Sequence, residues 1–213
     1  MRFNRWTWFL LLLALPPLTF ACSDEEPGGA TATPAVLDDL APALPSAEEI
    51  GQALPSLAPI QPEYFQGPRT NEDEVSTAID PTKTQQEIDE FGRVTGYEGS
   101  YKPEEGEEEI LVGLALFETV EGANRWLQAR SDVDQLVQLY GPDAEVEEFD
   151  AGDVGNEAKG ITATLNVAVT TVILRVGNVV AFAQVAVSQE DVTGEVTELA
   201  RLVAEKVQAL LEA

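Results

Sequence analysis

Oxygen-bearing side chains gather in the segment DAGDVGNE, residues 150–157, which contains Asp150, Asp153, Asn156 and Glu157. Carboxylate and amide oxygens are the ligands that calcium prefers in proteins. The spacing is not that of an EF-hand loop, which alternates its acidic ligands before a glycine and ends on a distant glutamate. We therefore expect a turn between strands here, with calcium binding at these four residues as the alternative.

A second acidic cluster, PEEGEEE, precedes an apolar run and contains Glu104, Glu105, Glu107, Glu108 and Glu109. Crowded carboxylates of this kind could gather calcium loosely, but a run of like charges is more often a solvated loop. We expect a hairpin loop and assign no metal site to it.

Residues for nucleophilic catalysis are scarce. The chain has no histidine and a single cysteine, Cys22. A Ser-His or Cys-His nucleophile and a typical zinc site are therefore excluded. No GxGxxG follows a predicted strand, and no GxxxxGK is present. Only carboxylates or a Ser-Lys pair remain, and no spacing singles one out, so we expect no catalytic residue and no cofactor.

Aromatic residues offer a different chemistry, an apolar pocket between sheet and helices that accepts a lipid or another hydrophobic molecule. The candidates are Phe91, Tyr97, Phe117, Trp126 and Phe182, together with Tyr101 and Tyr140. The same side chains could instead fill the interior of the domain. Both interpretations remain open on the sequence alone.

The elements that must position these residues follow from hydrophobic spacing. Asp80-Pro81 predicts the start of a helix that ends at Gly92, and VTGYEGSY, residues 94–101, predicts an edge strand. Residues 110–117 are apolar on both faces, as in a central strand, and Thr119 caps the helix that follows. A second short helix is expected over 132–140.

The C-terminal half is rich in strand patterns. ITATLNVAV, residues 161–169, alternates as a strand with one buried face and continues into TTVILRV. The pair Gly177-Asn178 predicts a hairpin to VVAFAQVAV. A long helix is expected from Ser188, with an apolar stripe: Val192, Val196, Leu199, Val203, Val207 and Leu210. The predicted fold is α+β, a two-layer sandwich with an antiparallel sheet of four or five strands and helices on one face.

The N-terminus has the features of an export signal. Arg2 and Arg5 precede an apolar run from Trp6 to Ala21, which is 16 residues long and shorter than the ~20 of a spanning helix. We assign residues 1–21 to a signal peptide, 22–62 to an acidic, Pro/Ala-rich tether and 63–213 to one extracytoplasmic domain. Within the tether, Leu54, Leu57 and Ile60 are expected to dock on the folded body.

The net charge is −26. Such a charge repels nucleic acid and anionic lipid surfaces, and no basic patch with interleaved aromatics is present. Nucleic-acid binding is therefore excluded, and the acidity itself identifies no partner.

The border Leu18-Thr19-Phe20-Ala21-Cys22 resembles the lipobox of bacterial lipoproteins. The resemblance implies that Cys22 carries acyl chains such as palmitate and anchors the protein on the extracytoplasmic face of the cell membrane. Ordinary signal cleavage with an incidental cysteine is the alternative.

A further resemblance rests on LVGLALFETVEGANRWL, DVGNEA, LRVGNVVAFAQV and the closing helix. These segments look like small extracytoplasmic domains of bacterial lipoproteins and, loosely, like extracellular sensor domains of bacterial membrane kinases. Those sensors are usually disulfide-bonded, which one cysteine does not permit, so the sensor role is not carried over. We expect a non-catalytic, lipid-anchored binding or interaction module with a protein partner or hydrophobic ligand. The alternatives are a carrier of a lipid or other hydrophobic molecule and, third, a carboxylate-based enzyme.

Overall fold

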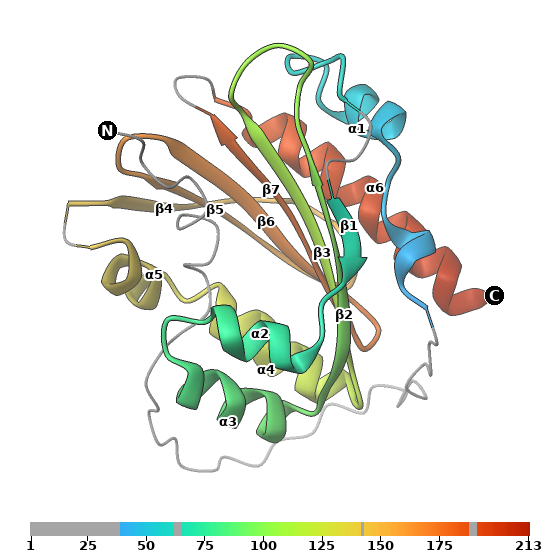
Figure 1. The fold of residues 1–213 in the computed structure, drawn as a ribbon, viewed down its shortest axis with the longest axis vertical. Coiled ribbons are helices and arrows are strands. Elements are labelled where there is room, and N and C mark those ends of the chain that lie inside the picture. The colour runs from blue at the N-terminus through green and yellow to red at the C-terminus, as the bar shows by residue number, and fades with distance from the viewer. Residues whose placement is uncertain (1–38, 62–64, 142, 188–190) are drawn as a thin grey trace.

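The protein is described by a computed structural model that covers residues 39–61, 65–141, 143–187 and 191–213. Its centre is a seven-stranded antiparallel sheet with the order β1-β2-β3-β7-β6-β5-β4 (Figure 1). The strands are β1 (Phe65–Pro68), β2 (Arg93–Tyr101), β3 (Glu109–Phe117), β4 (Glu145–Phe149), β5 (Glu157–Thr164), β6 (Ala168–Val176) and β7 (Val179–Val187). The helices are η2 (Ala41–Ala43), α1 (Ala47–Ala53), α2 (Asn71–Thr77), α3 (Pro81–Phe91), α4 (Val120–Arg130), α5 (Val133–Tyr140) and α6 (Thr193–Glu212).

The helices begin where the capping residues of the sequence predict. Asp80 accepts a hydrogen bond from the backbone N–H of Lys83, and Thr119 accepts one from Gly122 at the start of α4. α3 ends at Gly92 in the left-handed conformation, which glycine adopts without steric cost. These boundaries confirm the predicted helices, including α5 behind Asp132.

Two hydrophobic cores lie on opposite faces of the sheet. On one face, β3, β6 and β7 contribute residues such as Val112, Val172 and Ala183, which pack against Val196 and Val203 of α6. On the other face, the alternate residues of the same strands, including Ile173 and Val180, pack against Ala123, Trp126 and Leu127 of α4. The sheet is therefore buried on both sides, which explains why β3 is apolar at successive positions.

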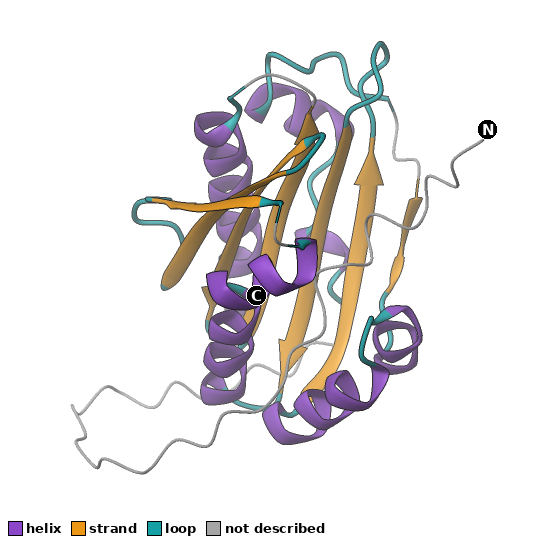
Figure 2. Ribbon diagram, turned by 90° about the vertical axis from the view of Figure 1, so that its left-hand side faces the viewer, coloured by secondary structure: helices purple, strands orange, loops and turns teal. Residues whose placement is uncertain are grey.

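Two parts of the predicted architecture are wrong. The sheet has seven strands in the described residues, not four or five, because the short outer strands β1 and β4 add to it. Helices cover both faces, not one, so the domain has three layers (Figure 2). The sheet can pack against α4 as well as α6 because the side chains on both faces of β3, β6 and β7 are apolar. The α+β class itself is confirmed.

Two strand predictions also need correction. VTGYEGSY forms β2, but it is not an edge strand, because Phe65 to Pro68 pair with Ser100 to Tyr97. The run from Ile161 to Val176 is not one strand, since it turns back at residues 165–167 and pairs with itself as β5 and β6. The hairpin at Gly177-Asn178 is confirmed, with Gly177 at φ 58°.

Residues 39–61 belong to the folded body. Leu54, Leu57 and Ile60 are buried, as predicted, and so are Leu40 and Ile50. η2 and α1 lie against α6, on the side of the sheet opposite α4 (Figure 1). The hydroxyl of Tyr101 donates a hydrogen bond of 2.7 Å to the carbonyl of Pro45, which ties this segment to β2.

The C-terminal helix shows the predicted stripe. Val196, Leu199, Val203 and Val207 are fully buried, and Leu210 is partly buried. The expected start at Ser188 lies outside the described residues, where the assignments of 1–21 and Cys22 also lie. Within the described ranges, none of the helices combines the length and apolarity needed to cross a bilayer.

Candidate ligand-binding site

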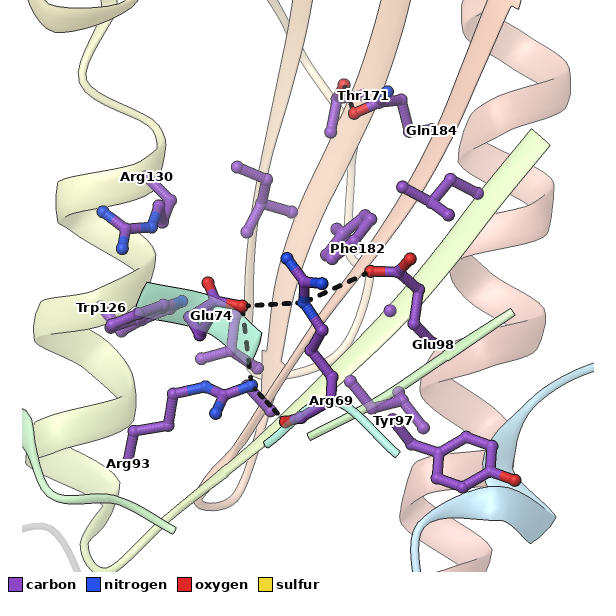
Figure 3. Close-up of a pocket in the computed structure, with 16 residues that line it drawn as sticks. Arg69, Glu74, Arg93, Tyr97, Glu98, Trp126, Arg130, Thr171, Phe182 and Gln184 are labelled. Atoms are coloured by element: carbon purple, nitrogen blue, oxygen red, sulfur yellow. Dashed lines mark hydrogen bonds and ion pairs between the residues drawn. The ribbon is translucent and has the colours of Figure 1, made fainter. Parts of the chain in front are cut away.

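A pocket of about 120 Å³ lies on the α4 face of the sheet. Its floor is made by the central strands β2, β3, β7 and β6, and its walls come from α2, α4 and the segment before α2 (Figure 3). The lining residues are Arg69, Glu74, Arg93, Tyr97, Glu98, Leu111, Gly113, Leu114, Ala115, Trp126, Arg130, Thr171, Ile173, Val180, Phe182 and Gln184.

The floor of the pocket is apolar. Leu111, Ala115, Ile173 and Val180 project from neighbouring strands toward α4. The ring of Phe182 lies over its cross-strand neighbour Gly113. A Cβ atom at position 113 would come within 2.2 Å of this ring. Glycine is thus needed at this position for the ring to rest on the sheet.

Charged side chains form one wall. Glu74 accepts a hydrogen bond of 3.2 Å from Nε of Arg69 and lies 3.9 Å from Nη2 of Arg93 (Figure 3). Arg93 also donates to the side chain of Asn71, at 2.5 Å, and to the carbonyl of Arg69, at 3.1 Å. The capping box of α2, in which Thr70 and Asp73 bond each other's backbone N–H, fixes the helix that carries Glu74.

A second ion-pair network links α3 and α4. Nη1 of Arg130 donates a hydrogen bond of 2.8 Å to Glu87, and Nζ of Lys83 lies 3.2 Å from the same carboxylate. The Arg130 side chain is only 5% exposed. Its guanidinium lies 3.9 Å from the ring centre of Trp126, so the indole face covers it.

Burial acts on the ionisable groups of these networks. Burial raises the pKa of the Glu98 carboxyl, an effect that the nearby charge of Arg69 opposes. Nε of Arg69 lies 4.0 Å from Oε2 of Glu98. Burial also lowers the pKa of the Lys83 ammonium group against the opposing effect of Glu87.

The far end of the pocket is polar and uncharged. The hydroxyl of Thr171 donates a hydrogen bond of 3.4 Å to Oε1 of Gln184 on the adjacent strand (Figure 3). Both side chains are buried. The pocket therefore has an apolar middle between a charged wall and this amide and hydroxyl pair.

The structure separates the aromatic residues that the sequence groups together. Trp126 and Phe182 line the pocket, while Phe91 and Phe117 pack behind Trp126 with ring centres 6.4 Å and 5.4 Å from it. Tyr97 borders the pocket, but its ring turns to the other face and packs on the α6 core (Figure 3). Tyr101 is also buried in that core, and the side chain of Tyr140 lies outside the described part.

The four candidate calcium ligands make separate contacts. Asp150 accepts from the backbone of Gly152, Asn156 from the backbone of Gly177, and Glu157 from the side chain of Gln128. Asp153 is exposed. Within the described ranges, no three or more carboxylate, histidine or cysteine side chains come together as a metal site would require.

The sequence patterns did not predict a role for the arginine residues of this pocket. The chain has 12 basic residues against 38 acidic ones, yet Arg69, Arg93 and Arg130 all line this one pocket. Arg93 directly follows the predicted helix end at Gly92, and no predicted motif or periodic pattern included Arg69 or Arg130. The scarcity of basic residues was the only available hint that those present hold specific positions.

Comparison with known proteins identifies a fold and no family. No protein-family model matches the chain, and no curated protein matches it. The fold is similar to that of the extracellular domain of PknH from Mycobacterium tuberculosis, with a TM-score of 0.58 and 11% sequence identity over 83% of this chain and 98% of that one. An uncharacterised protein from Mycobacterium smegmatis matches with a TM-score of 0.40 and 13% identity over 78% of this chain and 96% of that one.

Proposed function

We propose that the protein is a non-catalytic, lipid-anchored module on the extracytoplasmic face of the membrane that binds a small molecule in the pocket beneath α4. The observation that carries this proposal is the pocket itself, with an apolar floor, polar groups at both ends and about 120 Å³ of space. The export-like segment 1–21 and the fold shared with an extracellular domain support the location.

The dimensions of the pocket argue against a lipid carrier. Pockets for lipid-sized and drug-sized ligands typically enclose roughly 300–1,000 Å³. The space beneath α4 is about 120 Å³, which suits only a compact molecule. A small ligand is therefore the better fit.

A carboxylate-based enzyme finds little support in the same pocket. A pair of catalytic carboxyl groups needs freedom to exchange protons with a substrate. Of the two carboxylates that line the pocket, Glu74 already contacts Arg69 and Arg93. Glu98 has a raised pKa but no second free carboxylate to act with. Binding without catalysis is the function that the geometry favours.

Native mass spectrometry of the full-length protein, extracted from its membrane in detergent, tests the binding function. Ala115→Leu adds bulk to the pocket floor, whereas Ala209→Leu adds the same bulk at an exposed position on α6. We expect a small bound molecule on the parent and on Ala209→Leu, and none on Ala115→Leu. Absence of a bound molecule from all three proteins, or equal occupancy in both variants, would contradict the proposal.

Fractionation tests the anchor. Cys22→Ser removes the only cysteine of the chain and with it the acylation site implied by the lipobox resemblance. The variant should leave the membrane fraction while keeping the melting temperature of the parent. Retention of Cys22→Ser on membranes would show that another feature holds the protein there.

A further inference from the structure

We infer that the ligand is a small carboxylic acid with a compact apolar body, and that Arg130 binds its carboxylate. This inference rests on the proposed function and adds the chemical class of the ligand. Three observations carry it: an unused edge of the Arg130 guanidinium, the local balance of charge and the shape of the pocket.

The first observation concerns the hydrogen-bond donors of Arg130. Nη1 donates to Glu87, but Nε and Nη2 are buried and have no hydrogen-bond partner among the described residues. These two nitrogens form one edge of the planar guanidinium, with parallel N–H groups. That edge matches the two oxygens of a carboxylate, which accept from it as a bidentate pair.

An unpartnered donor edge in the protein interior requires an explanation. Buried polar groups are nearly always hydrogen-bonded, because an unmet donor loses its water without replacement. Arg130 cannot turn easily toward another partner, since Glu87 holds Nη1 and the ring of Trp126 covers one face. No residue of the described ranges supplies this partner, and the pocket that Arg130 lines is where a ligand can enter.

The second observation is the sign of the local charge. The pocket lining contains three arginines, Arg69, Arg93 and Arg130, and two glutamates, Glu74 and Glu98. Glu87 and Lys83, which form the ion-pair network beside Arg130, add one charge of each sign, so a single negative charge on the ligand would balance this set. The chain as a whole is strongly acidic, with a net charge of −26, so the pocket is a local exception that favours an anion over a cation.

The third observation is the space available to the rest of the ligand. A cavity on the order of 150 Å³ in an engineered protein core holds benzene. The pocket beneath α4 has about 120 Å³ and an apolar floor that includes Ala115, Ile173 and Phe182. One aromatic ring or a short branched chain fits this space, whereas a free phosphate or sulfate would leave the floor uncovered.

Calorimetric titration with benzoate and benzyl alcohol on the full-length protein in detergent tests the inference. The two probes share a ring and differ in charge. We expect benzoate to bind at least about tenfold more tightly, since hydrogen bonds to a charged acceptor are the stronger ones. Equal affinity for the two probes, or tighter binding of benzyl alcohol, would overturn the carboxylate assignment.

Two substitutions identify the arginine responsible. Arg130→Lys keeps the charge but lacks the paired N–H edge, and should weaken benzoate binding by about tenfold or more while leaving benzyl alcohol unchanged. Arg201→Lys is the control, because Arg201 lies on α6 in an exposed pair with Glu198. Unchanged benzoate affinity in Arg130→Lys would remove Arg130 from the site.

The tests of the ligand class and of the proposed function fail in different ways. If benzoate does not bind but Ala115→Leu still loses the molecule seen by mass spectrometry, the pocket binds ligands and the carboxylate inference is wrong. If benzoate does not bind and Ala115→Leu has the same bound molecule as the parent, the carboxylate inference and the proposed function are both wrong. A crystal structure with bound benzoate in which Nε and Nη2 of Arg130 donate hydrogen bonds to water, and not to the carboxylate, would also overturn the inference.

Discussion

The guanidinium of Arg130 stacks on the indole ring of Trp126, one helical turn earlier on α4, at 3.9 Å from the ring centre. Phe117 of the sheet also contacts Trp126, with a distance of 5.4 Å between the two ring centres. This cation–π contact restricts the movement of the guanidinium. Aromatic packing and the ion pair with Glu87 thus position the same group.

Removing the charge of Glu87 should destabilise the protein. Glu87→Gln leaves Arg130 and Lys83 without the carboxylate that they share. The side chains of Arg130 and Glu87 are at most 10% exposed. Breaking such a buried pair costs about 3 kcal/mol of unfolding free energy. Urea denaturation monitored by circular dichroism measures this loss.

Glu90→Gln is the matched control for Glu87→Gln on the same helix. Glu90 pairs with Arg125, but the two side chains are 61% and 43% exposed, so water screens the interaction. We expect a change within about 0.5 kcal/mol. Equal effects of the two substitutions would show that the network between α3 and α4 adds nothing to stability.

The stability of Glu98→Gln should depend on pH. Burial raises the pKa of Glu98, so the folded state holds its proton more tightly than the unfolded state. At about pH 4 both states are largely protonated and the carboxyl has little effect. As pH rises toward about 7, ionisation costs the folded parent protein stability that the neutral glutamine does not lose.

The difference in unfolding free energy should therefore shift in favour of Glu98→Gln between about pH 4 and about pH 7. Denaturation curves at several pH values measure it, with Glu105→Gln as an exposed control. A shift in favour of the parent as pH rises would show that the attraction of Arg69 outweighs burial.

Glycine at position 122 permits the close packing of α4 on the end of α3. A Cβ atom at this position would lie 1.9 Å from the carbonyl oxygen of Phe91. Gly122→Ala should lower the unfolding free energy by about 2 kcal/mol through overpacking. Gly194, in the first turn of α6, has open space around it, so Gly194→Ala should be neutral or slightly stabilising. A tolerated Gly122→Ala would mean that α4 can move away from α3 without cost.

The segment before β1 should contribute directly to stability. Ile50 of α1 is fully buried against the α6 core, and Ile50→Ala should cost about 3 kcal/mol of unfolding free energy. The neighbouring Gln52 is exposed, so Gln52→Ala should have little effect. If Ile50→Ala were as stable as the parent, the packing of Ile50 on the α6 core would contribute nothing to stability. Thermal or urea denaturation of the two variants compares them.

Local features were the part of the fold that could be predicted. Asp80 and Thr119 each cap a helix where expected, because a side chain that bonds a free backbone N–H acts within three residues of the chain. The apolar stripe from Val196 to Val207 identified the buried face of α6 for the same reason: spacing along one element reports which of its sides avoids water.

The wrong predictions concern elements whose sequence pattern does not show which other strand or helix they contact. ITATLNVAV continued into TTVILRV without a glycine or proline, so Asn166 was the single turn-forming residue between Leu165 and Val167. Both apolar residues lie exposed at the hairpin tip. The apolar residues on both faces of β3 predict that this strand is buried on both sides. They do not predict the second layer of helices that buries it.

The candidate site divides in the same way. Sequence alone determined that a strongly acidic chain without histidine has no Ser-His or Cys-His catalytic pair, and that Trp126 and Phe182 would be inward-facing aromatic residues. Only the tertiary structure decided that Arg69, Arg93 and Arg130 meet at one pocket. Their meeting depends on β3 pairing with β7, whose residues lie 63 to 77 positions further along the chain, and on α4 crossing that sheet. Such contacts join distant parts of the chain, and no local spacing encodes them.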